Sequence, residues 1–219
     1  MSERYVKIAV LVSGGGTNLQ ALIDAQEAGI IKSGRISLVI SNKAGAYALE
    51  RAKNAGIEGI TVTKKKPAEG SADTDGKVIY CDSQEDFEAH IAALIKQHGI
   101  DLIVLAGFMS ILSEGFTTLF ANRIINVHPA LIPSFCGKGY YGLKVHEAAL
   151  KYGVKVTGAT VHFVNEVPDG GRIIAQKAVE VKDGDTPEIL QKRVMEQAEW
   201  IILPASTEKV CRQIKEGIL

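Results

Sequence analysis

The sequence predicts an α/β protein with an open, mostly parallel twisted sheet, helices on both faces and antiparallel strands toward the C-terminal part. Three observations lead to this prediction. Short apolar runs alternate with helical patterns through the first half, which is the order of a βαβα fold. These runs are rich in β-branched residues, as in strands buried on both faces of a sheet. Later, two strand-like segments flank a Pro-Asp-Gly-Gly turn, which favours an antiparallel pair.

Each element of the first half follows from its local pattern. Strands are expected where apolar and β-branched residues run together, at 6–12, 35–41, 57–63 and 101–106. Helices are expected between them, each with an apolar face or a start or stop residue: one after Asn18, one at 42–55 before Gly56, and one from the N-cap Ser83 to His98. Residues 64–76 have turn composition and are expected to form an exposed loop.

The second half is expected to close the sheet and add the last helices. A short helix should begin near Ser113, and residues 123–126 should form a strand. The remaining expected elements are a glycine-rich loop at 134–142, a helix at 143–152, antiparallel strands at 156–164 and 172–181, a helix from Thr186 to about Leu203, and a helix at 206–216. Pro204 is expected to separate the last two helices because it lacks an N–H group.

Composition excludes several classes of protein. Twenty-five basic and twenty-five acidic residues leave no global field for nucleic acid or an anionic membrane. No run of about 18 apolar residues is present, so no membrane span is expected. The cysteines, Cys81, Cys136 and Cys211, are odd in number and far apart. They indicate a reducing compartment, most simply the cytoplasm, with neither a disulfide framework nor a thiolate metal site.

The first glycine loop, Ser13 to Asn18, is a candidate phosphate site. A strand, a glycine loop and a helix together present backbone N–H groups and a helix N-terminus to an anion. Leu19 stands where a dinucleotide fingerprint needs its third glycine, and the loop lacks the Gly-Lys-Ser/Thr ending of a P-loop. A single phosphate group held by Gly15, Gly16, Thr17 and Asn18 remains. The alternative is a tight turn without a ligand.

The segment I-N-V-H-P, residues 125–129, is the candidate catalytic segment. Asn126 and His128 are two residues apart, so on a strand they project to the same side. Asp169, on the later turn, could orient or charge the imidazole; the alternative is a strand end with two satisfied polar residues. In open α/β sheets ligands bind beyond the carboxyl ends of the strands, where the glycine loop, residues 107–109 and this segment should converge.

Metal and nucleophile chemistry have little support. His128, His146, His162 and Asp169 show no helical metal-binding spacing, so no metal is expected. No G-x-S-x-G elbow occurs.

Several long motifs occur in the order found in one enzyme family. They are V-L-V-S-G-G-G-T-N-L-Q-A, S-N-K-A-G-A-Y-A-L-E-R-A, V-L-A-G-F-M-S-I-L-S, I-N-V-H-P-A-L-I-P, G-A-T-V-H-F-V and D-G-G-R-I-I-A-Q. From Val6 to about Pro204 the chain resembles the glycinamide ribonucleotide formyltransferases, folate-dependent enzymes of purine synthesis. The resemblance implies a single domain with a Rossmann-like core, residues 1–219. Its nucleotide-binding half is about 1–105, its folate-binding and catalytic half about 106–204, and its C-terminal helix 205–219.

The resemblance also implies a reaction and a set of site residues. The formyl group of 10-formyltetrahydrofolate, the co-substrate, would pass to the amino group of 5'-phosphoribosylglycinamide, with no metal or redox cofactor. The implied catalytic residues are Asn126, His128 and Asp169. The implied ribonucleotide-binding residues are Gly15, Gly16, Thr17, Asn18 and Glu199, and the implied folate-binding residues are Met109, Ser110, Ile111, Leu112, Asn126 and Gln84. The expected partners are small-molecule substrates, without nucleic acid or membrane, in a monomer or homodimer.

The expected chemistry assigns a role to each catalytic residue. Amine attack on the formyl carbon creates an oxyanion, which the Asn126 amide and a protonated His128 could stabilise. Proton transfer to the departing folate nitrogen calls for a group that titrates near neutrality, and Asp169 is expected to raise the pKa of His128. All three side chains should meet at the mouth of the Gly14–Asn18 loop. This chain also departs from the family in places. Ser110 stands where many members have an arginine, and Gln84 stands where many have a basic residue. The loops at 64–77 and 134–142 are longer than the corresponding loops of the family.

Three other functions remain open at this stage. Methionyl-tRNA formyltransferase and formyltetrahydrofolate hydrolase share the formyl-handling core. The first normally carries a further C-terminal RNA-binding domain and the second an N-terminal regulatory domain, and this chain is expected to have neither. A non-catalytic folate- or nucleotide-binding module would need neither His128 nor Asp169.

Overall fold

A computed structural model describes residues 5–65 and 78–219, which build one continuous eight-stranded sheet. The strand order is β4-β3-β2-β1-β5-β6-β7-β8. The strands are β1 (Val6–Val12), β2 (Gly34–Ser41), β3 (Glu58–Thr63), β4 (Val78–Tyr80), β5 (Leu102–Leu105), β6 (Ile124–His128), β7 (Val156–Phe163) and β8 (Ile173–Glu180). Pairing is parallel from β4 across to β6 and antiparallel from β6 to β8. The predicted fold class is confirmed.

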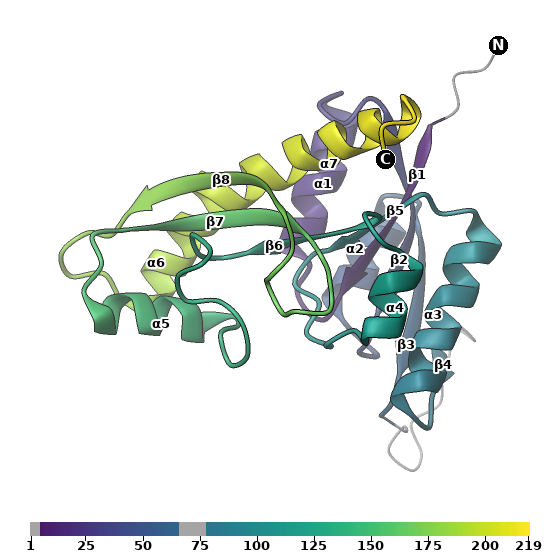
Figure 1. Cartoon of the computed structure of the whole chain (residues 1–219), viewed down its shortest axis with the longest axis horizontal. Coiled ribbons are helices and arrows are strands. Elements are labelled where there is room, and N and C mark those ends of the chain that lie inside the picture. The colour runs from purple at the N-terminus through teal and green to yellow at the C-terminus, as the bar shows by residue number, and fades with distance from the viewer. Residues whose placement is uncertain (1–4, 66–77) are drawn as a thin grey trace.

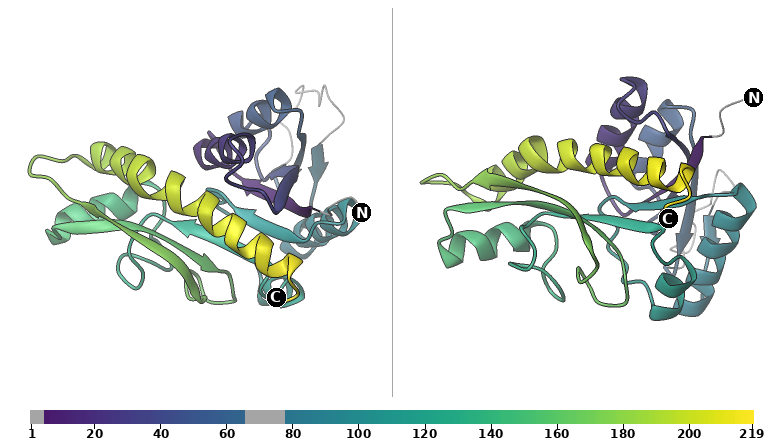
Figure 2. Two further views of the ribbon diagram at one scale, coloured as in Figure 1. Left: turned by 90° about the horizontal axis from the view of Figure 1, so that it is seen from above. Right: turned by 45° about the horizontal axis from the view of Figure 1, so that its top comes forward.

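Helices cover both faces of this twisted sheet (Figure 1). They are α1 (Thr17–Glu27), α2 (Tyr47–Asn54), α3 (Gln84–His98), α4 (Glu114–Leu119), α5 (Leu143–Tyr152), α6 (Pro187–Val194), the π-helical turn η1 (Met195–Glu199) and α7 (Trp200–Lys215). The long helix α7 lies across one face and contacts β1, β2, β7 and β8 (Figure 2).

Alternating side chains of the strands feed two cores. In β1, Ile8 and Val10 join the core beneath α1, α2 and α7, whereas Ala9 and Leu11 join the core beneath α3 and α4. All four are fully buried. Successive residues of a strand point to opposite faces, so a strand covered on both sides must be apolar throughout. That is why the continuous apolar runs in the sequence predicted the parallel strands.

The elements differ from the prediction in four places. The second helix begins at Tyr47 rather than at residue 42, because Gly45 has a φ of +70° and a helix cannot run through it. The three-residue strand β4 was not predicted; most of the predicted loop before it, residues 66–77, lies outside the described residues. Pro204 does not end a helix, and α7 runs from Trp200 through it to Lys215. The last helix was expected to begin at residue 205, but it begins at Trp200.

The interruption of this long helical segment lies at η1, just before Pro204. A π-helical turn already rearranges the backbone hydrogen-bond ladder, so a proline lacking its N–H is accommodated close by. Among the helices formed by residues 5–65 and 78–219, none combines the length and apolar character needed to cross a bilayer.

Candidate active site

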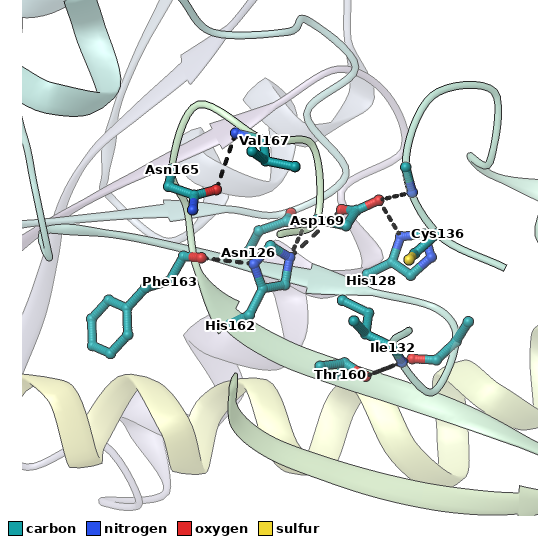
Figure 3. Close-up of polar contacts among 12 residues, drawn as sticks. Asn126, His128, Ile132, Cys136, Thr160, His162, Phe163, Asn165, Val167 and Asp169 are labelled. Carbon is teal, nitrogen blue, oxygen red and sulfur yellow. Dashed lines mark hydrogen bonds and ion pairs between the residues drawn. The ribbon is translucent and has the colours of Figure 1, made fainter. Parts of the chain in front are cut away.

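The antiparallel end of the sheet brings the three predicted catalytic residues together. Asn126 and His128 lie on β6, and Asn126 is opposite His162 of β7. Asp169 lies in the turn between β7 and β8, with a φ of +58°. Its Oδ2 is 3.5 Å from His128 Nδ1 and its Oδ1 is 3.6 Å from His162 Nε2. Figure 3 shows the carboxylate between the two imidazoles, with Asn126 beside His162.

The imidazole of His128 is buried between two hydrogen-bond acceptors. Only 4% of the residue is exposed, and Nε2 lies 2.8 Å from the carbonyl oxygen of Phe135. A carbonyl can only accept, so Nε2 carries a hydrogen and donates it. Nδ1 faces the Asp169 carboxylate, also an acceptor. An imidazolium can donate to both partners. In a neutral ring with its hydrogen on Nε2, the lone pair of Nδ1 faces a lone pair of Asp169 Oδ2.

Asp169 raises the pKa of His128 as expected, but the net shift of this pKa is downward. Burial lowers the pKa of His128 below its usual value and outweighs Asp169 and the Phe135 carbonyl, which both raise it. Asp169 limits the downward shift of the pKa without reversing it. Because the neutral ring lacks a hydrogen at Nδ1, this atom can take up a proton.

Asp169 is held in its charged form. Burial alone would raise the pKa of Asp169, but the contacts from His162, His128 and the Gly137 backbone together lower it. The Gly137 N–H donates to Oδ2 at 2.8 Å. An ionised carboxylate is thus present beside Nδ1 of His128 before any proton arrives there.

The turn that holds Asp169 leaves no room for side chains at its glycines. A Cβ atom built on Gly171 would lie 1.7 Å from the Phe163 carbonyl oxygen, and one on Gly170 would lie 2.6 Å from Val167. Both contacts are far below van der Waals distance. The sequence Asp-Gly-Gly is therefore needed to fold the chain closely enough for the carboxylate to reach both histidines.

His162 is a site residue that sequence reasoning missed. Its Nδ1 donates to the carbonyl of Phe163 at 2.8 Å, and its Nε2 faces Asn126 and Asp169 Oδ1. The Asn126 amide nitrogen lies 3.2 Å from this Nε2, within hydrogen-bond distance. This bond orients the amide of Asn126 and leaves its second N–H for another acceptor. The strand pattern around His162 was recognised, but its register against β6 was needed to find the contact.

A second buried histidine, His146 of α5, lies near His128. It is fully buried, and neither ring nitrogen has a hydrogen-bond partner among the described residues. Burial, followed by the nearby His128 imidazole, lowers the pKa of His146 to about 4. This ring is neutral at any working pH of the site and adds to the apolar surroundings of His128.

A pocket of about 130 Å³ joins two of the three predicted catalytic residues, Asn126 and Asp169, to the predicted folate segment, whereas His128 lies behind its wall. Asn126, His162 and Asp169 form one part of its wall; the rest is lined by Leu105, Phe108, Ser110, Ile111, Leu112, Val164, Asn165, Glu166, Val167 and Pro168. Apolar walls with a few convergent polar groups are typical of small-molecule sites. The segments around Ser110 and Asp169, about sixty residues apart in the sequence, thus form one cavity.

Two predicted folate residues lie outside this pocket lining. Met109 is 50% exposed, and its N–H donates to Ser13 Oγ at 2.7 Å. Gln84 donates to the carbonyl of Ile111 at 3.1 Å and to Glu88 at 2.6 Å. Gln84 therefore holds the lining segment from behind.

The glycine loop has the open backbone expected of an anion site. A Cβ atom on Gly14 or Gly15 would meet nothing within 4 Å, so this side of the loop is free for a ligand. Gly16 has a φ of +71°, and a side chain there would collide with Ala48. The Gly15 carbonyl accepts from Arg51 Nε at 2.8 Å. Helix α1 starts here without a side-chain cap or an acid in its first turn, which leaves its positive end for an anion.

The predicted ribonucleotide residues Asn18 and Glu199 meet directly, although 181 positions separate them. The Asn18 amide donates to Glu199 Oε2 at 2.7 Å. Glu199 lies in the turn η1, and burial raises its pKa while the bond from Asn18 opposes the rise. The Asn18 Oδ1 atom is buried without a partner among the described residues. Such an unpaired acceptor suits a ligand that donates a hydrogen bond.

Two hydrogen bonds connect the glycine-loop side with the pocket. One joins Met109 to Ser13, which precedes the loop. The other runs from Asn42, after β2, to the hydroxyl of Ser110 at 2.7 Å. Ser110 stands where many relatives were expected to carry an arginine, and here it serves as a short link between the ends of β2 and β5.

The comparisons with known proteins agree with this geometry. Residues 6–206 match the formyl transferase family. The chain belongs to this family. It is 42% identical over 90% of its length to a phosphoribosylglycinamide formyltransferase of Haemophilus influenzae, and the match covers 84% of that protein. A solved structure of glycinamide ribonucleotide transformylase 1 from Symbiobacterium toebii aligns with a TM-score of 0.80 at 39% identity, covering 99% of this chain and 94% of that one.

Other relatives are longer than this chain. A chloroplastic phosphoribosylglycinamide formyltransferase of Arabidopsis thaliana is 37% identical over 89% of the chain. A trifunctional purine biosynthetic protein of Gallus gallus is 42% identical over 94% of the chain. The chain spans 62% of the length of the first and 18% of the second.

Proposed function

We propose that the chain transfers the formyl group of 10-formyltetrahydrofolate to the amino group of 5'-phosphoribosylglycinamide, a step of de novo purine synthesis. One observation carries the proposal: Asn126 and Asp169 line the same pocket as Ser110, Ile111 and Leu112. Two of the proposed catalytic side chains and the apolar segment proposed for the folate therefore line one cavity. The printed names of the relatives in Haemophilus influenzae and Gallus gallus support the acceptor and the pathway.

The acceptor would be held at two points. Its phosphate group would accept hydrogen bonds from the backbone of Gly15 and Gly16 and from the N-terminus of α1. Its glycinamide end would pair with Glu199 and with the free Oδ1 of Asn18, which are buried side by side. Binding at both ends places the amine in a fixed position, and such positioning lowers the barrier of a two-substrate reaction.

The reacting groups then have separate tasks. The amine attacks the formyl carbon, and the second N–H of Asn126 donates to the oxyanion, while His162 holds the amide in place. Asp169, which lines the pocket, passes the proton released by the amine to Nδ1 of neutral His128. Its 3.5 Å contact with Asp169 then becomes an ion pair. As the bond to the folate nitrogen breaks, the proton passes to that nitrogen, which leaves tetrahydrofolate and the formylated amine.

This assignment changes the expected role of His128. A ring whose pKa is lowered is a better proton acceptor at neutral pH than a permanent cation. Asp169 acts mainly on the charged form that arises during the reaction, because it lowers the free energy of the imidazolium. Differential stabilisation of this kind accelerates the chemical step.

The decisive assay offers purified protein 10-formyltetrahydrofolate with three acceptors: glycinamide ribonucleotide, charged initiator tRNA and water. We expect turnover only with the ribonucleotide. Equal turnover without it would favour a formyltetrahydrofolate hydrolase, and turnover on the tRNA would favour a methionyl-tRNA formyltransferase. Tight binding of both ligands without any product would indicate a non-catalytic module.

We also propose a cytoplasmic location and a monomer or homodimer. Cys81, Cys136 and Cys211 are all free, which fits a reducing compartment.

A further inference from the structure

A second cluster of reactive side chains lies at the opposite edge of the sheet from β7 and β8. Cys81 follows β4, and Asp86 and His90 lie one turn apart on α3. Their ligand atoms, one from each residue, all lie within 4.8 Å of one another. Strand order places five strands between β4 and β7, so this cluster is separate from the site around His128.

The distances in the cluster match the edges of a metal coordination sphere. Cys81 Sγ is 3.9 Å from His90 Nδ1, and His90 Nδ1 is 3.1 Å from Asp86 Oδ1. Tetrahedral zinc has bonds of about 2.3 Å to sulfur and about 2.0–2.2 Å to nitrogen and oxygen, which puts its ligand atoms about 3.3–3.6 Å apart. The two His90 distances are within a few tenths of an ångström of these values, and the third pair, Cys81 and Asp86, lies within 4.8 Å.

The backbone already fixes two of these three ligands. The Cys81 N–H donates to the Thr63 carbonyl at 2.9 Å, which ties the residue to the end of β3. Asp86 is positioned by the N-cap of α3, because its N–H donates to Ser83 Oγ at 3.0 Å. His90 Nδ1 lies 2.9 Å from the carbonyl oxygen of Asp86 and can donate to it. A cation would replace that hydrogen, so binding exchanges one hydrogen bond for a metal bond.

The charges around the thiol favour a cation. Asp86 and Asp82 place negative charge beside the Cys81 thiol, while Lys64 opposes them. The same carboxylates that disfavour a bare thiolate attract a divalent ion. A bound ion displaces the thiol proton, because metal binding to cysteine requires the thiolate.

We propose that Cys81, Asp86 and His90 bind a divalent transition-metal ion of the zinc type, with water in the fourth position. A set of one thiolate, one imidazole and one carboxylate suits zinc far better than magnesium or calcium, which prefer oxygen ligands alone. The ion would join the edge strand β4 to α3. It is separate from formyl transfer and takes no part in that reaction.

Cobalt titration of the metal-stripped full-length protein tests the proposal. Thiolate-bound Co²⁺ gives near-ultraviolet charge-transfer absorption, and zinc should abolish this band by displacement. We expect one equivalent of Co²⁺ to bind, with loss of the band in Cys81→Ser and at least tenfold weaker binding in His90→Gln. His90 is substantially exposed, so His90→Gln should fold even if Cys81→Ser does not.

Matched controls come from the same chain. Cys136→Ser removes another cysteine, and His98→Gln removes another histidine of α3 that lies beside a carboxylate, that of Glu58 at 3.9 Å. Both controls should keep the band and the affinity of the unsubstituted protein. Zinc should also raise the melting temperature of the unsubstituted protein and of both controls. Absence of the band, or a band that persists in folded Cys81→Ser, would overturn the proposal.

Discussion

At the scale of single residues, His128 is subject to two opposing influences. Burial lowers its pKa, and Asp169 raises it. Removing the charge of Asp169 therefore lowers the pKa of His128 further. If neutral His128 is the working form, activity is lost as the pH falls through this pKa.

The variant Asp169→Asn should reveal this arrangement. We expect kcat to fall by about 10²-fold or more, because the imidazolium formed in the reaction loses its partner. The acid limb of the kcat/KM profile should move to lower pH, while ribonucleotide affinity changes little. His128→Ala should lower kcat at least as much. Near-full turnover in either variant contradicts these roles, and an activity lost on raising the pH would make the charged ring the working form.

Part of this site could be predicted from the sequence. Strand alternation alone places Asn126 and His128 on one side, and the resemblance added Asp169. The sign of the His128 pKa shift could not be predicted, because it depends on how deeply the ring is buried. The contact of His162 with Asn126 also depends on the strand register. A one-residue slip in register would turn His162 to the other face of the sheet.

At the scale of elements, α3 supports the pocket from outside. Glu88 is buried and accepts hydrogen bonds from the Ser113 N–H at 2.7 Å, from the Ser113 hydroxyl and from Gln84 at 2.6 Å. These bonds fix the end of the segment that lines the pocket. Sequence patterns place Glu88 in a helix but do not indicate that its carboxylate faces three donors.

Glu88→Gln tests this support. The substitution replaces one carboxylate oxygen by an NH₂ group, which donates and cannot accept. At least one of the hydrogen bonds from Ser113 or Gln84 is therefore lost, at a cost of about 1.5–3 kcal/mol. We expect the free energy of unfolding to fall by a similar amount and the KM for the formyl folate to rise several-fold, with kcat changed less than twofold. The control is Glu85→Gln, an exposed residue of the same turn. An unchanged KM in Glu88→Gln would show that Glu88 stabilises α3 without shaping the pocket.

The elements themselves were largely predictable. Both ends of α3 carry the expected signals, with Ser83 capping the first turn and Gly99 at a φ of +62°. A three-residue strand such as β4 is too short to show a period, so its pairing with β3 was not visible. The uninterrupted passage of α7 through Pro204 depends on the neighbouring π-helical turn, which has no simple sequence pattern.

At the scale of the whole molecule, η1 sets the rotation between α6 and α7. Leu190 and Val194 of α6 and Leu203 of α7 are all fully buried in one core. An α-helix turns by about 100° per residue, so removing one residue from η1 rotates one side of this segment relative to the other. The rotation cannot keep both buried faces in place.

Deleting the exposed Gln197 should therefore destabilise the fold. Misplacing Leu190 and Val194 costs about 1.5–3 kcal/mol for each side chain, and each kcal/mol lowers the melting temperature of a chain this size by about 2–4 °C. We expect a fall of about 6 °C or more in a calorimetric scan. Gln197→Ala, which keeps the length of η1, should melt within about 2 °C of the parent. A deletion variant as stable as Gln197→Ala would show that η1 does not set the rotation.

The crowded turn beside Asp169 affects how tolerance to substitution should be interpreted. Every side chain at Gly171 meets the Phe163 carbonyl, whatever its chemistry. Loss of activity there reports a lack of backbone space, whereas loss of activity at Asp169 can report a missing charge. A mutational scan that ranks positions only by intolerance to substitution would therefore not distinguish these two causes. Asp169→Asn keeps the size of the side chain and removes its charge, so it tests the chemistry of this turn without changing its geometry. No substitution at Gly171 offers the same test.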